Sequence, residues 1–289
     1  MRLAGVAIAL ICLARAPQGV PTVSLDIQAR SVQPGELVLL MITTDAPASA
    51  VRVRAFDRDV PPYRSGDREW QALVGIDLDA SVDTHRISVE ADVDGRTGHA
   101  GYDLVVQPKR FPTRTLEVDE AFVNPPASER ERIAREAREL ADIWNAPSPT
   151  RLWAGPFVRP VPQATNSAFG TRSVFNGQPR SPHGGADFLS PAGTPVKAPN
   201  SGRVVLARDL YYTGNSVVID HGLGLFSFFA HLSAIDVREG DDVLTGEVLG
   251  RVGATGRVTG PHLHWTLRAG GARVDPLSLL ALLGEHPDR

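Results

Sequence analysis

Short runs in which apolar and polar residues alternate fill the first third of the chain, from Val20 to about Val106. Runs of this kind that are rich in β-branched side chains predict strands with one buried face and one exposed face. Turn signals such as Pro34-Gly35 and Asp94-Gly95 separate them. Because no helical pattern interrupts the series, it predicts an antiparallel sandwich of immunoglobulin-like type. The expected strands are 23–27, 37–42, 50–55, 87–91 and 102–106.

The pattern changes to a helical period between residues 128 and 145. Apolar side chains recur there at helical spacing while Glu and Arg alternate on the remaining face, which predicts an amphipathic connecting helix. Ser128 and Glu131 have the spacing of a capping box at its start, and Pro147 follows its end. The apolar side chains are Ile133, Ala137, Leu140 and Trp144.

From Leu152 onward, short β-segments are separated by closely spaced glycines, which mark turns and bulges. Helix is scarce until Pro276–Leu283, an expected short helix after Asp275. This part of the chain therefore predicts an antiparallel β domain. Its expected strands are 202–207, 216–220, 225–229, 248–252 and 263–267.

These patterns divide the 289 residues into an N-terminal segment, two β domains and a linker. A chain of this length is typical of about two domains. The sandwich is expected over 17–107 and the C-terminal β domain over 150–289. Between them, 108–149 forms a proline-rich linker that carries the helix and one further strand at 115–118. The fold class is therefore mainly β with one connecting helix.

The first residues have the form of a secretory signal peptide over 1–16. Met1-Arg2 supplies the positive start, an apolar run follows, and Ala14-Arg15-Ala16 is a cleavage candidate. The apolar run is shorter than the about 20 residues of a membrane span. We therefore expect a periplasmic or secreted protein with no stable membrane anchor after cleavage.

Composition narrows the function classes. A hydrophobic fraction of 42% with 22% charged residues is ordinary for a folded globular protein. The net charge of −3 does not favour a nucleic-acid partner. Cys12 is the only cysteine, and the residues before it lack the small side chain of a lipoprotein signal. The expected mature chain thus has neither disulfides nor thiol chemistry.

Four of the eight histidines and one aspartate lie in three short stretches of the C-terminal region. His183 and Asp187 are four residues apart, His231 stands alone, and His262 and His264 form a His-x-His pair. Imidazole nitrogen and carboxylate oxygen are ligand types that zinc accepts. On a strand, residues two apart point to the same face, so the His-x-His pair can face one site. Three ligands would leave one tetrahedral position open, as in catalytic zinc sites.

Three further histidines have no ligand-type companions nearby. We expect His85 and His99 to be solvated, and His221 to begin a turn before Gly222. No catalytic constellation is visible before Pro147.

The residues around the His/Asp cluster resemble the lysostaphin-type, or LytM, zinc metallopeptidases, which cut peptidoglycan cross-bridges. The resemblance extends from about Thr165 to Leu283, and the order and spacing of its motifs are specific. It implies a C-terminal fold of the barrel-sandwich hybrid type and one zinc ion per chain. The motifs include Ser167-Ala-Phe-Gly-Thr-Arg172, Ser181-Pro-His-Gly-Gly-Ala-Asp187, Gly214-Asn-Ser-Val-Val-Ile-Asp-His-Gly222, Ala230-His-Leu232 and Gly256-Arg-Val-Thr-Gly-Pro-His-Leu-His264.

The family pattern implies a role for each of the five residues. His183, Asp187 and His264 would bind zinc. His231 and His262 would orient and deprotonate the attacking water, and which of the two is the general base stays open. The implied reaction is hydrolysis of amide bonds in the stem-peptide cross-links of peptidoglycan.

Two alternatives compete with this interpretation. Residues 237–250 also resemble the hammerhead of lipoyl and biotinyl carrier domains, but those need a lysine at a hairpin tip, and no lysine follows Lys197. The second is a zinc-binding, non-hydrolytic cell-wall module that regulates another wall enzyme. The N-terminal sandwich would target the wall, shield the cleft or act as a spacer, and we expect a monomer.

Overall fold

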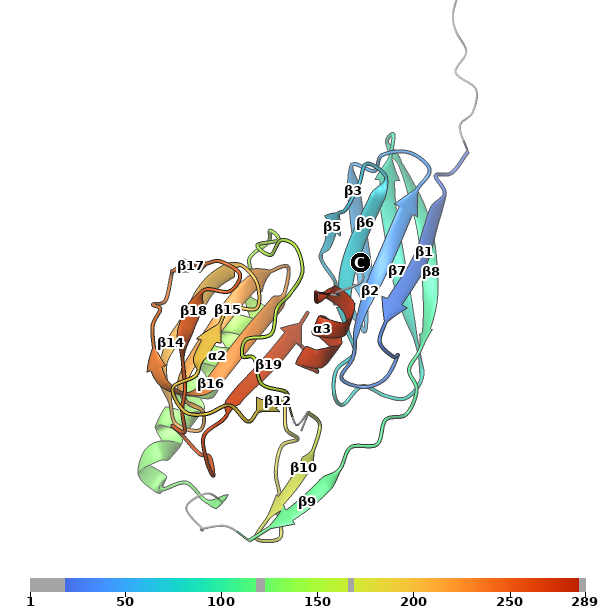
Figure 1. The fold of residues 1–289 in the computed structure, drawn as a ribbon. Coiled ribbons are helices and arrows are strands. Elements are labelled where there is room, and N and C mark those ends of the chain that lie inside the picture. The colour runs from blue at the N-terminus through green and yellow to red at the C-terminus, as the bar shows by residue number, and fades with distance from the viewer. Residues whose placement is uncertain (1–18, 118–122, 166–168, 286–289) are drawn as a thin grey trace, which may run out of the picture.

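The computed structural model describes residues 19–117, 123–165 and 169–285. The expected signal peptide with Cys12, Val118 of the expected linker strand, and Ser167 and Ala168 of the first motif lie outside these ranges. Within them, no helix is long and apolar enough to cross a bilayer. Two β-rich regions lie side by side, with the C-terminal helix α3 (Pro276–Leu283) between them (Figure 1).

The N-terminal region is a sandwich of two antiparallel four-stranded sheets, as predicted. Their strand orders, β1-β2-β6-β5 and β4-β3-β7-β8, correspond to the A-B-E-D and C′-C-F-G sheets of an immunoglobulin-like fold. One sheet contains β1 (Val23–Ala29), β2 (Leu37–Thr44), β5 (Pro62–Arg64) and β6 (Glu69–Gly75). The other contains β3 (Ala50–Ala55), β4 (Arg58–Asp59), β7 (Thr84–Val93) and β8 (Arg96–Val105).

Strand β6 was not predicted, because it is buried on both faces. Val74 belongs to the core of the sandwich, whereas its neighbour Leu73 packs into the core of the C-terminal region. The side chains of β2 are also shared between the two cores: Leu37 and Leu39 pack into the core of the C-terminal region, and Val38 and Leu40 into that of the sandwich. A strand that is covered on both sides loses the alternation of apolar and polar residues that marks a half-exposed strand.

A buried ionic cluster reinforces this junction. Glu36 is 1% exposed and accepts hydrogen bonds from Arg30 at 2.7 Å and Lys109 at 2.8 Å. Burial alone would raise the pKa of the Glu36 carboxyl, but these two cations hold that pKa below its ordinary value. Arg30 also contacts Asp275, the N-cap of α3, at 2.8 Å. The sandwich is therefore joined to the C-terminal region by a shared core and by an ionic cluster whose carboxylates, Glu36 and Asp275, are buried.

The C-terminal region is built on a nine-stranded antiparallel sheet. Its main path runs β12-β19-β16-β15-β14-β17, while β13 pairs with β18, β18 with β16, and β20 with β19. Trp265 and Phe229 stack in its core, with ring centroids 6.2 Å apart. The strands are β12 (Gly185–Phe188), β13 (Pro195–Lys197), β14 (Gly202–Leu210), β15 (Gly214–Gly222), β16 (Leu225–Ile235), β17 (Asp242–Val243), β18 (Val248–Val252), β19 (Leu263–Ala269) and β20 (Ala272–Val274).

The connecting helix forms as predicted, but its start differs. Helix α2 spans Arg130–Asn145 and follows a 3₁₀ turn, η1, at Ala127–Glu129. Ser128 lies inside that turn, and neither η1 nor α2 has a side-chain hydrogen bond at its N-cap, so the expected capping box is absent. The apolar face of α2 packs on the sheet, where Trp144 meets Phe226 with ring centroids 5.3 Å apart.

A small third sheet places the linker beside the segment that leads to His183. Strand β9 (Thr113–Leu116) pairs in parallel with β10 (Arg172–Phe175), which pairs with β11 (Gln178–Pro179). The linker strand predicted at 115–118 thus begins two residues earlier. The rings of Phe111 and Phe169 lie 6.3 Å apart and join the same two segments.

Candidate metal centre and active site

Three neighbouring strands bring the five predicted residues together. Asp187 on β12 and His264 on β19 are direct partners in the sheet register. Ala230 on β16 pairs with His264 from the other side, so the next residue, His231, also reaches this place. His262 precedes β19, and His183 precedes β12. The site therefore lies over β12, β19 and β16.

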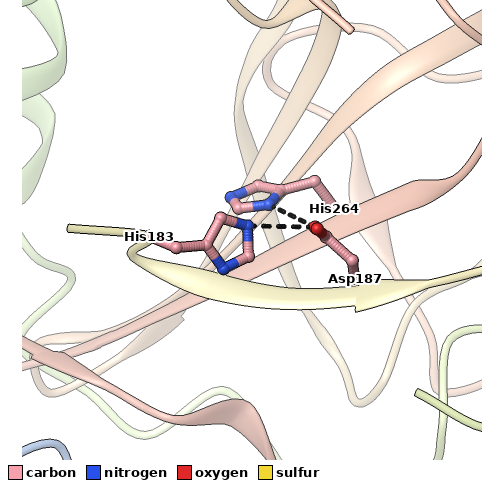
Figure 2. Close-up of side chains that lie close together, drawn as sticks. All are labelled: His183, Asp187 and His264. Carbon is pink, nitrogen blue, oxygen red and sulfur yellow. Dashed lines mark hydrogen bonds and ion pairs between the residues drawn. The ribbon is translucent and has the colours of Figure 1, made fainter. Parts of the chain in front are cut away.

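His183, Asp187 and His264 form a compact donor set (Figure 2). One carboxylate oxygen of Asp187 lies 3.1 Å from His183 Nε2 and 2.9 Å from His264 Nδ1. Donor atoms that bind one zinc ion at about 2.0–2.1 Å in a tetrahedron are separated by about 3.3 Å. The observed spacings and the two-imidazole, one-carboxylate chemistry therefore fit a single zinc ion.

The backbone at Gly185 allows β12 to lie close to β19. A Cβ atom on Gly185 would lie 2.9 Å from the His264 imidazole and 2.5 Å from the carbonyl oxygen of Trp265. Glycine at this position lets β12 lie against β19 with Asp187 facing His264. Burial alone would raise the pKa of the Asp187 carboxyl, but the imidazoles of His183 and His264 hold that pKa well below its ordinary value. The carboxylate is therefore in its ligand form at neutral pH.

A hydroxyl orients the His264 ring. Thr266 lies two residues further along β19, and its Oγ1 is 2.9 Å from His264 Nε2. If Nε2 donates to this hydroxyl, Nδ1 carries the lone pair that faces Asp187 and a metal ion. Burial also lowers the pKa of His264, which favours the neutral ring that a metal requires.

His231 and His262 border the donor set, and a backbone carbonyl oxygen holds the Nδ1 atom of each ring. His231 Nδ1 lies 3.0 Å from the carbonyl oxygen of Thr255, and His262 Nδ1 lies 2.9 Å from that of Gly260. Because a carbonyl oxygen only accepts hydrogen bonds, Nδ1 carries the hydrogen in both rings, so the neutral form of each ring has its lone pair on Nε2. The two ring centroids are 4.9 Å apart. Burial, followed by repulsion from His264, lowers the pKa of His231 to about 4, so this ring is neutral at neutral pH.

His231 occupies a left-handed backbone conformation, with φ at 64°. This conformation is costly for a residue other than glycine and is found where the surrounding structure enforces it, often at functional sites. Thr255 supplies part of that enforcement. Its hydroxyl donates to Leu232 O at 2.8 Å and accepts from Asn215 N at 2.9 Å, while its carbonyl accepts from His231. The histidine is thus held from both β15 and the loop before β19.

Among the described residues, the other histidines lie outside this cluster. His99 is exposed on β8, and His85 contacts Ser81 and the ring of Phe56 in the sandwich. The prediction that His221 begins a turn is wrong, since it lies in β15 with no exposed surface. Its ring nitrogens meet Ser201 O at 2.8 Å and Ser227 Oγ at 2.9 Å, and burial lowers its pKa to about 4.

Comparison with known proteins relates the C-terminal region to peptidases. The sequence pattern of peptidase family M23 matches residues 181–276, which contain all five residues of the site. The peptidoglycan DD-endopeptidase ShyA of Vibrio cholerae is 47% identical over 96 residues, which are 33% of this chain and 22% of that protein. The DD-carboxypeptidase/endopeptidase Mpg of Neisseria meningitidis is 45% identical over 97 residues, or 34% of this chain and 22% of that protein. The match therefore spans about a fifth of the length of these curated relatives.

One solved structure is similar over most of the chain. It is a Pseudomonas aeruginosa protein assigned to peptidase M23, with 32% sequence identity and a TM-score of 0.68. The alignment covers 87% of this chain and 96% of that one. The similarity therefore includes the N-terminal sandwich as well as the region that carries the site.

Proposed function

Because the chain belongs to peptidase family M23, we propose that it is a zinc metalloendopeptidase that hydrolyses amide bonds in the peptide cross-links of peptidoglycan. The observation that carries this proposal is the donor set of His183, Asp187 and His264, whose atoms lie within 4.8 Å of one another. Two further histidines border it: His262 Nε2 lies 3.7 Å from Asp187 Oδ1, and the ring centroid of His231 lies 5.9 Å from that of His264.

In this proposal the three donors hold one zinc ion per chain. When bound, zinc polarises a water molecule and the scissile carbonyl and stabilises the negative charge that develops on the carbonyl oxygen. The donor set leaves room for this chemistry because three protein ligands do not complete a tetrahedron. The lowered pKa values of Asp187 and His264 favour the deprotonated forms in which these two side chains can bind a metal ion.

His231 and His262 perform the proton transfers in this proposal. The Nε2 lone pair of one ring accepts a proton from the attacking water, and the resulting imidazolium returns it to the leaving amine nitrogen. The Nδ1 hydrogen bonds to Thr255 and Gly260 fix the ring orientations for this step. Either ring has the correct tautomer to be the general base.

The substrate assignment is supported by the relatives that share the region of the site. Both ShyA and Mpg carry endopeptidase names, and ShyA is named for peptidoglycan. A wall substrate agrees with the expected signal peptide and with a periplasmic or secreted location. We further propose that the chain acts as a monomer, with a sandwich over 17–107, a linker over 108–149 and a peptidase region over 150–289.

Metal content and wall digestion test this function together. We expect purified protein to bind close to one zinc ion per chain and to release soluble peptides from cross-linked sacculi. A chelator should stop the release, and added zinc should restore it. Protein that holds zinc but leaves the cross-links intact would favour the alternative, a non-hydrolytic wall module that regulates another enzyme.

A further inference from the structure

The three donor residues of the candidate metal centre are held by two different parts of the chain. Asp187 and His264 are direct partners in the nine-stranded sheet, on β12 and β19. His183 lies in the segment between β11 and β12, outside the strands of this sheet. Both of its backbone polar groups bond to the segment just before β10: its N–H donates to Thr171 O at 2.9 Å, and its carbonyl accepts from Gly170 N at 2.8 Å. The position of this one donor therefore depends on how the segment before β10 is held.

The N-terminal sandwich packs directly against this segment. Phe169 is 5% exposed, and its ring lies so close to Gly35 of the sandwich that a Cβ atom on that glycine would overlap it. Gly35 is itself fixed at the junction of the two regions. Its carbonyl accepts from Asp275 N at 2.7 Å, and its N–H donates to Ile76 O at 2.9 Å. A well-anchored part of the sandwich thus supports the residue that precedes Gly170.

The linker holds the same segment from a second direction. The ring of Phe111 lies on Gly170, where a Cβ atom would overlap it, and this ring also meets that of Phe169. The next residue, Pro112, accepts from Arg172 N at 2.8 Å, and β9 then runs parallel to β10 (Figure 1). Residues 169–175 are therefore held between the sandwich on one side and the linker on the other.

Resting on the proposed function, which makes His183 a zinc ligand, we propose that the sandwich and the linker are positioning elements of the metal centre. They hold His183 in place through the rings of Phe169 and Phe111. Groups that orient a metal ligand contribute to the affinity for the ion, because the ligand is then placed before the ion binds. The N-terminal half of the chain therefore sets how tightly the site binds zinc. A wall-targeting module, a shield or a passive spacer would not need these two ring contacts.

The zinc affinity of the full chain tests this inference. Zinc alone is titrated into each protein in competition with a chromophoric chelator. Phe111→Ala should raise the Kd for zinc by about 10- to 100-fold, the range typical when a group that orients a metal ligand is lost. Phe111→Leu should keep most of the affinity because it fills much of the same space. Phe111→Val should fall between the two, and it decides the test if the alanine variant does not fold. In cobalt-loaded protein, the visible spectrum of Phe111→Ala should also change, because it reports the ligand geometry around the ion.

Tyr63→Ala is the matched control. Tyr63 lies on β5 and also packs an aromatic ring at the junction of the two regions, but its partner is Trp153, with ring centroids 5.5 Å apart. This variant should bind zinc as the wild type does. Wild-type zinc affinity in Phe111→Ala, or an equal loss in Tyr63→Ala, would overturn the inference. Because no substrate is present, wild-type protein that binds zinc but cleaves no cross-link would contradict the proposed function alone.

Discussion

Asp187→Ala is expected to lose bound zinc and to reduce cross-link cleavage by at least about 10³-fold, or roughly 4 kcal/mol in transition-state free energy. Asp187 is the only carboxylate of the donor set, and one of its oxygens contacts both His183 Nε2 and His264 Nδ1. Its removal leaves two neutral imidazoles without the negative charge that stabilises a divalent cation. Metal content by mass spectrometry and the initial rate on sacculi measure the two effects separately.

Asp209→Ala provides the control for this variant. Asp209 is an exposed carboxylate on β14 that pairs with Arg132 at 2.7 Å, away from the donor set. Its loss should change neither zinc content nor rate, because exposed ion pairs contribute little. If Asp187→Ala kept one zinc ion per chain and a rate within a few-fold of wild type, the assignment of the metal centre would be wrong.

His262→Ala is expected to keep zinc and to lose about 10²- to 10⁴-fold in rate, the usual contribution of a general acid–base group. We expect that the ring does not hold the metal, since its Nε2 lies 3.7 Å from Asp187 Oδ1, further than the nitrogens of His183 and His264. Because Gly260 O accepts a hydrogen bond from its Nδ1, the neutral ring would have its lone pair on Nε2, the nitrogen nearer to Asp187. The variant therefore separates metal binding from proton transfer.

His99→Ala is the matched histidine control, because His99 is exposed on β8 of the sandwich. It should match wild type in both zinc content and rate. Loss of zinc from His262→Ala would instead make His262 a ligand and reverse the division of roles between the two histidines of the His-x-His pair.

The fold was predictable where one face of an element is exposed or where a terminal signal is strong. The bounds of β3, β18 and α3 agree with the predicted ranges. Asp275 caps α3 by accepting from Leu277 N at 3.0 Å, and Pro276 follows it, so the start of this helix is encoded locally.

The junction between the two regions was not predictable. Leu37 and Leu39 look like ordinary strand residues, and nothing in their sequence says that a helix from the far end of the chain covers them. The backbone N–H of Leu37 bonds to Ser278 Oγ at 2.9 Å, a contact between residues 241 positions apart. Such contacts arise from the packing of complete elements, so a linear pattern does not contain them.

The candidate site shows the same contrast. The five residues could be singled out because their types suit zinc and because strand geometry places alternate residues on one face. Thr266 could have been found in the same way, two residues after His264. Thr255 could not, because it acts on His231 through a backbone carbonyl that every residue possesses.

The most direct test of the central claim is hydrolysis of one defined amide bond in ¹⁸O-labelled water. A purified diaminopimelate-type muropeptide dimer is incubated with zinc-loaded protein, and the products are identified by mass spectrometry. Our account predicts two monomers, with one ¹⁸O atom in the newly formed D-alanine carboxyl group and none in the other product. A dimer that stays intact with zinc-loaded wild-type protein, or monomers released at an equal rate by His262→Ala, would contradict it.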